Sequence, residues 1–357
     1  AFDASRAETM PGVVRIIPME SGVVVVATNT WYAFQAAERI EFTWAPASHP
    51  ETTDEHRQHI ERGFDQEPHY RARDHGDVER ALEAAEILEG TYSVPYLAHA
   101  TMEPLNATAL LEDGHLDIWV GNQFPTLAVL VGSRLTGLPK EAVRVHTPYM
   151  GGGFGRRFEM DDVEAAVRAA QAMPGRPIRV TYSREEDFSH DAYRPMAAAR
   201  FRAAVAEGKP LALDLDLSVP SLFFSGHERR RALTGEPERE VPKKDISMTM
   251  GAGNQPYQIE NYRVTAYRPT HLLPVGWWRS VGESQNCFFQ ESILDELARA
   301  AGVDPLAMRL ELLKHAPSRR VLERVAEMSN WGSALPPGRA RGLAYAMSTG
   351  AATAEVI

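Results

Sequence analysis

The sequence predicts an α+β fold, and two observations support this class. Short β-rich runs such as PGVVRII, IRVTYS and LALDLDLSV recur along the 357 residues, and branched side chains of this kind favour strands. Helix-like stretches stand between and after these runs, and three of them follow one another between residues 282 and 328. The chain shows no period-matched repeat and no low-complexity tract.

The segment 12–47 is predicted to form two strands, a helix and a third strand. PGVVRII and GVVVVAT are β-rich, NTWYAFQAAERI begins at an Asn-Thr cap, and EFTWA is extended. Residues 48–86 are polar and highly charged, which predicts a surface connection. His56 and His59 lie three residues apart in this segment. Without further ligands nearby they indicate solvated histidines rather than a metal site.

A denser alternation of strands and helices begins near residue 87. Strands are predicted at residues 88–95, 107–111 and 116–121, before a helix at 125–136. There follow a strand AVRVHTP, a helix at 160–173 with carboxylates in its first turn, and strands IRVTYS, 195–207 and LALDLDLSV. Residues 221–256 predict an irregular loop, and YRVTAYRPT a further strand. The chain ends in an alternating strand, and because neither end carries a start or stop signal we expect a piece of a larger protein.

Composition and charge exclude several classes of protein. Apolar residues make up 44% of the chain and charged residues 24%, as in ordinary globular proteins. The formal net charge of −10 argues against a general nucleic-acid binder. Cys287 is the only cysteine, which excludes an internal disulfide framework, a cysteine-ligated zinc site and iron–sulfur ligation by this chain alone. We expect Cys287 to be a buried packing residue.

The stretch MGGGFGRRFE, residues 150–159, is the strongest local motif. It lacks the Lys-Ser/Thr of a phosphate-binding loop and the glycine spacing of a dinucleotide fingerprint. One interpretation is a plain hinge between a strand and a helix. The other is a ligand cradle: glycines expose main-chain N–H groups, a helix begins near Met160, and Arg156 and Arg157 could serve a phosphate. In that interpretation Phe154 forms a wall or lid over an anionic, bulky cofactor.

Other segments share a fixed order with the glycine loop. They are AETMPGVVRII through WYAFQAAERIEFTW, then YLAHATMEPLNATA, WVGNQFP, MGGGFGRR, and WWRSVGESQN followed by FFQESILDELARAAGVDPLAMRLELL. In combination they resemble the molybdenum-binding large subunit of the xanthine oxidase family. The branch is that of the bacterial isoquinoline 1-oxidoreductase β-subunits and membrane-associated aldehyde dehydrogenases.

The resemblance implies a division of the chain. Residues 1–47 resemble the latter part of an α/β hammerhead domain, and residues 48–86 then form a linker. Residues 87–332 resemble the first half of an aldehyde oxidase/xanthine dehydrogenase-type molybdopterin-binding domain. Residues 333–357 would begin a truncated second half.

The resemblance also implies cofactor-binding residues. Gln123 in WVGNQFP is similar to the family glutamine that hydrogen-bonds an oxygen ligand of molybdenum. The segment Gly152, Gly153, Phe154 and Gly155 is similar to the loop whose backbone amides face the apical oxo group and the pterin. Without the family, Gln123 has the simpler interpretation of satisfying buried backbone groups.

Arg279 in WWRSVG matches the family arginine beside the cofactor. The sequence departs from the family there, with Ser280 and Glu283 where glycines are common, which leaves the shape of the loop open. Arg279 could alternatively stack on the neighbouring tryptophans. We interpret Glu103 and Asn106 of MEPLNAT, and His99 of LAHA, as structural residues rather than ligands.

The chemistry implied is a molybdenum-dependent hydroxylase or dehydrogenase that oxidises aldehydes or N-heterocyclic aromatics with water as the oxygen source. The cofactor is molybdopterin or its cytosine dinucleotide form. The family's catalytic glutamate base has no equivalent in this chain, so we assign no catalytic residue and no protein ligand to a metal. We expect the isolated chain to be inactive and its cofactor site empty. The alternative is a non-catalytic binding or assembly module that keeps the fold.

Partners and location follow from the same resemblance. Electrons would leave through a small 2Fe-2S protein of the same complex, and then through a cytochrome c partner. The missing portions of the large subunit itself, together with a small-molecule substrate, are the other partners, and no nucleic acid is expected. The branch implies a periplasmic or periplasmic-membrane-associated protein, with the cytoplasm as the alternative.

Overall fold

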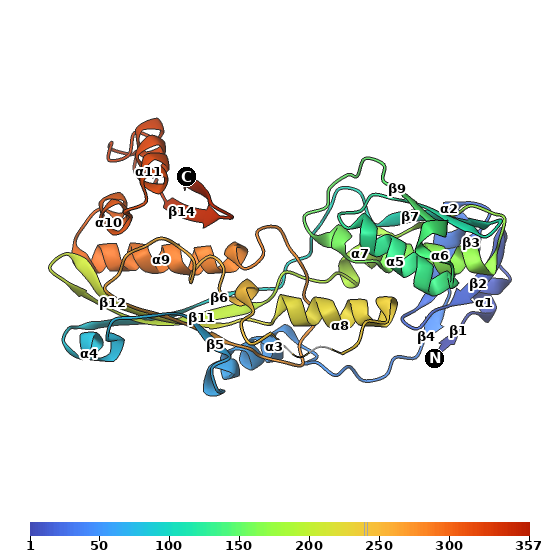
Figure 1. Cartoon of the computed structure of the whole chain (residues 1–357), viewed down its shortest axis with the longest axis horizontal. Coiled ribbons are helices and arrows are strands. Elements are labelled where there is room, and N and C mark those ends of the chain that lie inside the picture. Colours follow the sequence, from blue (N-terminus) through green and yellow to red (C-terminus); the bar gives the residue numbers. More distant parts are fainter. Residues whose placement is uncertain (239, 241) are drawn as a thin grey trace.

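The chain folds around two main β-sheets, in a computed structural model that describes residues 1–238, 240 and 242–357 (Figure 1). The larger sheet has the order β5-β13-β12-β11-β6, with β12 and β13 parallel and the other pairs antiparallel. Its strands are β5 (Tyr70–His75), β6 (Ile87–Val94), β11 (Ala197–Ala206), β12 (Lys209–Ser218) and β13 (Asn261–Tyr267). We call this sheet and the helices on it the large lobe.

Helix α9 (Glu283–Ala301) covers one face of the larger sheet (Figure 1). Phe289, Ile293 and Leu297 recur every four residues on one side of the helix and are fully buried in the same core cluster as Leu213 and Leu215 of β12. Each such side chain contributes roughly 1.5–3 kcal/mol by leaving water. Further elements extend this core: α10 (Pro305–Leu312), α11 (Ala316–Met328) and the hairpin of β14 (Leu343–Ser348) and β15 (Ala351–Val356). The predicted single terminal strand is therefore two strands, because Thr349 and Gly350 turn with positive φ.

The opposite face of the larger sheet is charged, since Asp214 and Asp216 alternate with the leucines of β12. Arg263 pairs with Asp214 at 2.6 Å and Arg200 with Asp216 at 2.9 Å. Near this face lie three elements of the segment 48–86: α3 (Thr53–Glu61), η1 (Arg62–Asp65) and α4 (Val78–Glu83).

The segment 48–86 is more than the surface connection that its polarity suggests. Its strand β5 is an edge strand of the larger sheet, and Ile60 and Leu82 are buried. The prediction of a solvated histidine is wrong for His56, which is 4% exposed with its ring edge-on to Tyr96. Burial lowers the pKa of His56. Strand β5 escaped prediction because edge strands tolerate charged side chains.

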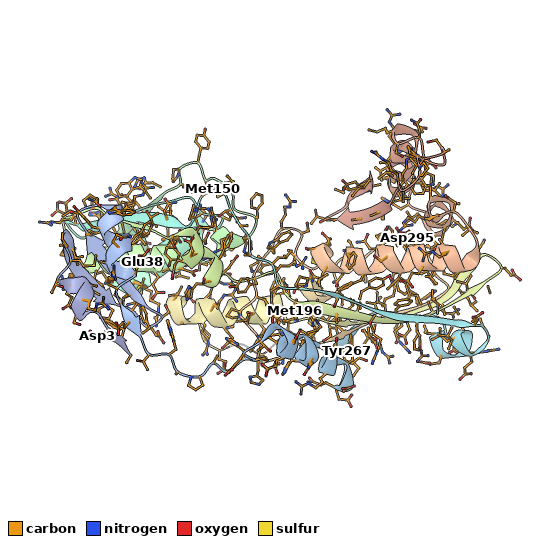
Figure 2. The ribbon with its side chains drawn as sticks, turned by 180° about the vertical axis from the view of Figure 1, so that it is seen from behind. Asp3, Glu38, Met150, Met196, Tyr267 and Asp295 are labelled. Carbon is orange, nitrogen blue, oxygen red and sulfur yellow. The ribbon has the colours of Figure 1, made fainter. Side chains whose placement is uncertain are left out.

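The small lobe is built on the second sheet, with the order β10-β7-β8-β9. Its strands are β7 (Asn106–Glu112), β8 (His115–Val120), β9 (Val143–His146) and β10 (Ile178–Thr181). Helices α5 (Pro125–Thr136) and α6 (Asp161–Ala172) share a core with β7 and β8. A 3-10 turn, η2 (Lys140–Ala142), leads into β9. Figure 2 shows the molecule from behind, with Met150 on the small lobe and Asp295 on α9 of the large lobe.

The N-terminal residues attach to the small lobe. Strands β2 (Val13–Pro18) and β3 (Val23–Ala27) form a hairpin whose Ile17, Val24 and Val26 pack against Ala165 and Ala169 of α6. The remaining elements there are β1 (Phe2–Asp3), α1 (Ser5–Glu8), α2 (Thr30–Ala37) and β4 (Glu41–Phe42). The predicted strand, strand, helix and strand are thus present, and whether they form part of a hammerhead domain stays a prediction.

The prediction of an irregular loop at residues 221–256 is wrong in its first part. Helix α8 (Leu222–Thr234) occupies it, capped by the Ser221 hydroxyl, which accepts from Phe224 N–H, and ended by Gly235 at φ +66°. The helix was missed because three consecutive arginines interrupt any apolar stripe. Two shorter helices complete the fold, α7 (Arg184–Ser189) and the 3-10 turn η4 (Ile246–Met248).

The described residues lack two features. No described helix has both the length and the apolar character that crossing a bilayer requires. The described residues also contain no group of three or more His, Cys, Asp or Glu side chains placed to hold a metal ion.

Candidate functional site

The glycine loop, residues 151–155, leads from the small-lobe sheet into the 3-10 turn η3 (Arg156–Phe158). Gly152 has φ +108° and Gly155 has φ +106°, conformations that side-chain-bearing residues rarely adopt. A Cβ on Gly155 would lie 1.2 Å from the main-chain oxygen of Trp277. Glycine is therefore required here by a contact with the segment between β13 and α9 as well as by the turn.

Gln123 is held against this loop at two points. Its N–H donates to Arg157 O at 3.0 Å, and its side-chain Oε1 accepts from Gly155 N–H at 3.0 Å. Because a backbone N–H can only donate, the amide is oriented with Oε1 toward the loop. The Nε2 group, a double donor, has no hydrogen-bond partner among the described residues.

The main chain of the loop offers further donors. The N–H groups of Gly152, Gly153 and Phe154 donate to no described residue. A Cβ on Gly153 would meet Gln123 Oε1 at 2.6 Å, so the amide lies directly on the bare main chain. Buried or half-buried donors without acceptors indicate that a ligand or solvent completes them.

Phe154 and Arg279 close the outer side of the loop. Phe154 has φ +54° and is 43% exposed, and the Arg279 guanidinium carbon lies 5.7 Å from the centre of its ring. The sequence departs from the family next to Arg279, yet Ser280 at φ +74° and Val281 at φ +53° keep a left-handed backbone there. Such strain at non-glycine residues concentrates at functional sites. The structure thus brings together Gln123, Gly152, Gly153, Phe154, Gly155 and Arg279.

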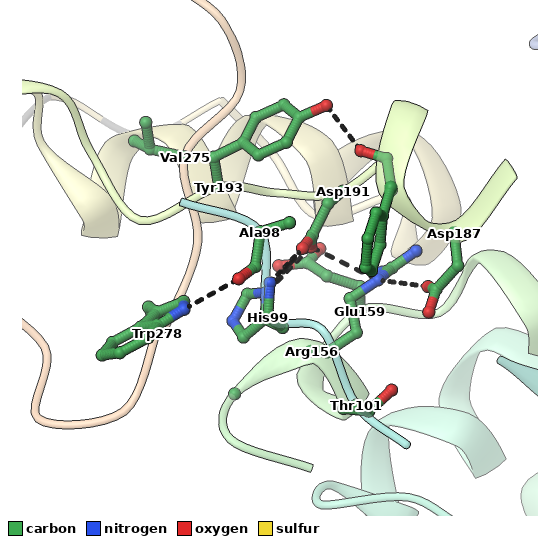
Figure 3. A network of polar contacts seen from close by, with 12 residues as sticks. Ala98, His99, Thr101, Arg156, Glu159, Asp187, Asp191, Tyr193, Val275 and Trp278 are labelled. Carbon is green, nitrogen blue, oxygen red and sulfur yellow. Dashed lines mark hydrogen bonds and ion pairs between the residues drawn. The ribbon is translucent and has the colours of Figure 1, made fainter. Parts of the chain in front are cut away.

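Arg156 does not face the open side of the loop. The prediction that it could bind a phosphate is therefore wrong. It is 1% exposed, and its guanidinium pairs with Asp187 at 3.0 Å and Asp191 at 3.3 Å (Figure 3). A third carboxylate, Asp161, lies 3.0 Å away. Burial opposes its charge, but the three carboxylates hold its pKa above the ordinary value. Arg156 anchors the loop from beneath.

Arg157 is likewise turned inward. Its guanidinium donates to Gly152 O, Gly121 O and the Glu103 carboxylate at 2.9–3.1 Å. Burial alone would raise the pKa of Glu103, but Gly151 N–H, Asn106 and the charge of Arg157 hold it below the ordinary value. Glu103 is thus a structural partner of the loop, as we interpreted it from the sequence.

His99 and Asp191 form a buried pair that sequence reasoning missed. His99 Nδ1 lies 2.8 Å from Asp191 Oδ1, with the side chains 1% and 2% exposed (Figure 3). Because a carboxylate only accepts, the hydrogen sits on Nδ1. His99 Nε2 has no partner among the described residues and would lie 3.0 Å from a Cβ on Gly155. Because the two residues are 92 positions apart in the chain, no sequence signal links them.

The first turn of α6 already holds carboxylates. Asp161 pairs with Arg156, and Asp162 is 1% exposed. Burial, assisted by the charge of Asp161, raises the pKa of Asp162 to about 7. The N-terminus of α6 therefore already interacts with carboxylates of the chain itself and is not free to bind another anion.

Comparison with known proteins assigns the family. Residues 62–229 and 237–313 match the model of the molybdopterin cofactor-binding domain, which is well over half of the chain. The chain belongs to this family. The predicted relationship to the molybdenum-binding subunits of the xanthine oxidase family is thereby confirmed.

Curated relatives of the molybdopterin-binding chain are distant in sequence. It is 27% identical over 360 residues to the β-subunit of the isoquinoline 1-oxidoreductase of Brevundimonas diminuta, covering 96% of this chain and 45% of that protein. It is 29% identical over 364 residues to one subunit of the nicotinate dehydrogenase of Pseudomonas putida, covering 97% and 30%. A membrane-bound aldehyde dehydrogenase of Gluconacetobacter polyoxogenes is 27% identical, with 96% and 48% covered. The chain spans less than half the length of these relatives.

Solved structures share the fold. The aldehyde oxidoreductase of Desulfovibrio gigas superposes with a TM-score of 0.70 at 20% identity, covering 97% of this chain and 44% of that one. The quinoline 2-oxidoreductase of Pseudomonas putida 86 gives a TM-score of 0.66 at 17% identity, covering 92% and 48%. The predicted α+β, molybdopterin-binding architecture is confirmed.

The geometry of the loop fits part of such a cofactor. Free N–H groups at Gly152, Gly153 and Phe154, with the Gln123 Nε2, suit oxygen ligands and the polar edge of a pterin. Arg156 and Arg157 both form ion pairs with carboxylates of the chain itself, so neither is available to bind a phosphate at the loop. Cys287 is no candidate nucleophile, because burial raises the pKa of its thiol to about 12.

Proposed function

We propose that this chain forms one wall of the active site in a molybdenum-dependent oxidoreductase that acts on aldehydes or N-heterocyclic aromatics. The observation that carries the proposal is the convergence of Gln123, the bare main chain of residues 152–155 and Arg279 on one loop, in a chain of the molybdopterin-binding family. The bound molybdenum cofactor would supply the two-electron oxidation of a substrate carbon, with oxygen from water.

The chain's own residues would bind and orient the cofactor. Gln123 Nε2 would donate to an oxygen ligand, because its other end is fixed by Gly155 N–H. The N–H groups of Gly152, Gly153 and Phe154 would add main-chain donors in fixed positions, which need no reorganisation when a ligand arrives. Phe154 and Arg279 would screen this space from water.

The partners and location belong to the same proposal. A catalytic glutamate base would come from polypeptide outside residues 1–357, and electrons would pass to a 2Fe-2S partner, since a lone half-buried cysteine holds no cluster. A cytochrome c partner, a cytosine dinucleotide form of the cofactor and a periplasmic location are further expectations. By itself the chain would retain little cofactor and turn over no substrate.

Cofactor retention tests the proposal directly. The 357-residue chain would be produced in a bacterium that makes the molybdenum cofactor, and its molybdenum and pterin contents measured after purification. We expect contents well below stoichiometric for the unchanged chain, and background contents for Gln123→Ala and Gly155→Ala. Gly22→Ala is the matched control, because nothing lies within 4 Å of its added Cβ.

Each outcome has a meaning. Stoichiometric molybdenum would contradict the claim that essential parts of the site lie elsewhere. Equal pterin in all variants would show that the glycine loop is not the cradle. Background contents even in the unchanged chain would agree with an empty site in the isolated chain, and the same variants would then be measured in the complete subunit; a complete subunit without molybdenum would favour the alternative of a non-catalytic binding or assembly module.

A further inference from the structure

His99 lies where three segments of the chain meet beside the candidate site. Its main-chain N–H donates to Asp191 Oδ2 at 2.6 Å and its Nδ1 donates to Asp191 Oδ1 at 2.8 Å. The residue is thus fixed at two points to the segment between α7 and β11. The next residue, Ala100, has φ +51°, a strained conformation for a residue with a side chain. The position of the imidazole is therefore closely defined on its Nδ1 side.

The other ring nitrogen, Nε2, points away from Asp191 (Figure 3) and has no partner among the described residues. The side chain is 1% exposed, so bulk water does not complete it. Nε2 lies 3.0 Å from the position that a Cβ on Gly155 would take, and the Trp277 carbonyl oxygen lies 1.2 Å from that same position. Nε2 and the Trp277 oxygen are therefore neighbouring atoms at the glycine loop.

The Trp277 oxygen is also unused. It accepts no hydrogen bond from a described residue, and the Gly155 N–H already donates to Gln123 Oε1 at 3.0 Å. Because Nδ1 carries a hydrogen, an Nε2 without one would place two buried acceptors side by side with no donor for either. A hydrogen on Nε2 makes the same two atoms a donor and an acceptor.

The charges near His99 favour this second hydrogen. The ionisable side chains of its network and of the residues beside it are Arg156, Asp161, Asp187, Asp191, Tyr193 and Arg194, with Glu159 and Arg229 as a separate ion pair. Tyr193 stays neutral because burial raises its pKa. Outside the separate pair, three carboxylates thus face two guanidinium groups, and a positive imidazole would balance the third carboxylate.

The segment that contains Trp277 also carries Arg279. The Arg279 guanidinium carbon lies 5.7 Å from the centre of the Phe154 ring. Trp278 Nε1 donates to Ala98 O at 3.3 Å, so the residue before His99 already holds this segment once. A hydrogen bond from His99 to the Trp277 oxygen would hold it a second time, directly at the glycine loop. The separation between the two sides of the candidate site would then depend on His99.

We propose that His99 is a positioning residue. With hydrogens on both ring nitrogens it donates to Asp191 and to the Trp277 carbonyl oxygen, and so holds the segment that carries Arg279 against the glycine loop. The bond requires a small approach of the two neighbouring atoms, since they do not hydrogen-bond in this structure. The inference deepens the proposed function and rests on it for the purpose that this position serves.

Nitrogen magnetic resonance of the 357-residue chain tests the hydrogen on Nε2 directly. At about pH 7.5 a solvent-exposed histidine is neutral, whereas His99 should show two N–H nitrogens, identified by their loss in His99→Gln. Asp191→Asn should remove the Nε2 hydrogen, because the negative charge that balances it is gone. The matched control is Asp117→Asn beside the half-exposed His146, which should leave the His99 signals unchanged. An Nε2 without hydrogen in the unchanged chain would overturn the proposal.

Tryptic cleavage after the exposed Arg279 measures how often its segment opens. His99→Leu and His99→Gln introduce side chains of similar size, but only glutamine has a donor that reaches the Trp277 oxygen, while the shorter His99→Asn reaches only Asp191. We expect about tenfold faster cleavage in His99→Leu and His99→Asn, a difference of about 1.4 kcal/mol. His99→Gln should stay within about threefold of the unchanged chain. Cleavage after Arg339, exposed between α11 and β14, is the internal reference.

The outcomes separate the two proposals. Equal cleavage rates in all three variants would show that the imidazole only fills space and would overturn the role of His99. If His99→Leu does not fold, the nitrogen measurement on the unchanged chain still decides. Neither assay contains cofactor, so a failure here leaves the proposed function intact. A complete subunit without pterin would instead refute the proposed function and leave the assignment of His99 in place.

Discussion

Arg156 and Arg309 lie in different lobes and are both almost completely buried, yet only one of them has a closed set of partners. Arg309 donates through Nε to the Glu291 carboxylate at 2.8 Å, through Nη2 to Glu291 O at 3.0 Å and through Nη1 to Asp295 at 2.7 Å. Glu291 in turn accepts from Tyr257 and from the main chain of Tyr345. Every polar group in this network is used for holding α9, α10 and β14 together.

The network beneath the glycine loop is less complete. Arg156 has three carboxylate neighbours, but its Nη1 makes no hydrogen bond within the described part of the chain, and neither does His99 Nε2. Native proteins leave few buried polar atoms unpaired, and those few tend to mark functional sites. The two arginines thus differ in how completely their donors are used, but buried atoms without partners also occur on α9, at Gln285 and Gln290, so an open position by itself does not identify a site.

The largest expected effect is on the closed network. Arg309→Met should lower the free energy of unfolding by about 4 kcal/mol, because Glu291 would remain buried and charged without its partner. Denaturant titration measures this. Arg324→Met, at a pair 69% and 68% exposed, is the control and should cost less than about 0.5 kcal/mol. If Arg309→Met lowered the free energy of unfolding by as little as Arg324→Met, the network around Arg309 would not be what stabilises this part of the fold.

The next effect concerns the contact between the lobes. Gly155→Ala should destabilise the chain by about 3 kcal/mol, because the methyl group meets main chain at Trp277 and the residue must keep a positive φ. The same titration, with Gly22→Ala as reference, checks it. Unchanged stability would mean that the loop moves away from Trp277 freely.

A pH-dependent effect follows from Asp162. Its folded-state pKa of about 7 lies above the ordinary 3.8, so its favourable contribution is complete below about pH 4 and is lost as the pH rises to about 7. Asp162→Asn removes this loss and should be more stable than the unchanged chain at pH 8, by no more than the roughly 4 kcal/mol to which the full shift corresponds. The difference should vanish near pH 4. A pH-independent difference for Asp162→Asn would count against a raised pKa.

The smallest effect tests strain beside Arg279. Ser280→Gly should raise the free energy of unfolding by about 0.5–1 kcal/mol, because Ser280 is exposed and holds φ +74°. Thermal unfolding would detect the gain. A loss of stability would show that the serine hydroxyl contributes more than its backbone costs.

Much of the local structure could be predicted from the sequence, and the failures have physical causes. Strand β12 and helix α9 were predictable because their apolar spacing matches the periods of strand and helix. Helix α8 carries no apolar stripe, although its caps at Ser221 and Gly235 were visible. Strand β5 is an edge strand with charged side chains, so only its pairing with β13 reveals it.

The candidate site also has features that the sequence predicted and features that it did not. The contact between Gln123 and the glycine loop was expected from the resemblance, and the structure places them together. That Arg156 and Arg157 turn inward could not be predicted, because their partners Asp187 and Glu103 lie 31 and 54 residues away in the chain. The direction of a charged side chain depends on such tertiary partners rather than on its neighbours in sequence.

The touch of the Trp277 carbonyl on Gly155 also has a mechanical consequence. Because the Trp277 carbonyl oxygen lies where a Cβ on Gly155 would be, any movement of the segment before α9 away from the glycine loop must open this contact. A molecule bound by both segments would oppose that movement, and its arrival could be followed as resistance of the segment before α9 to proteolysis.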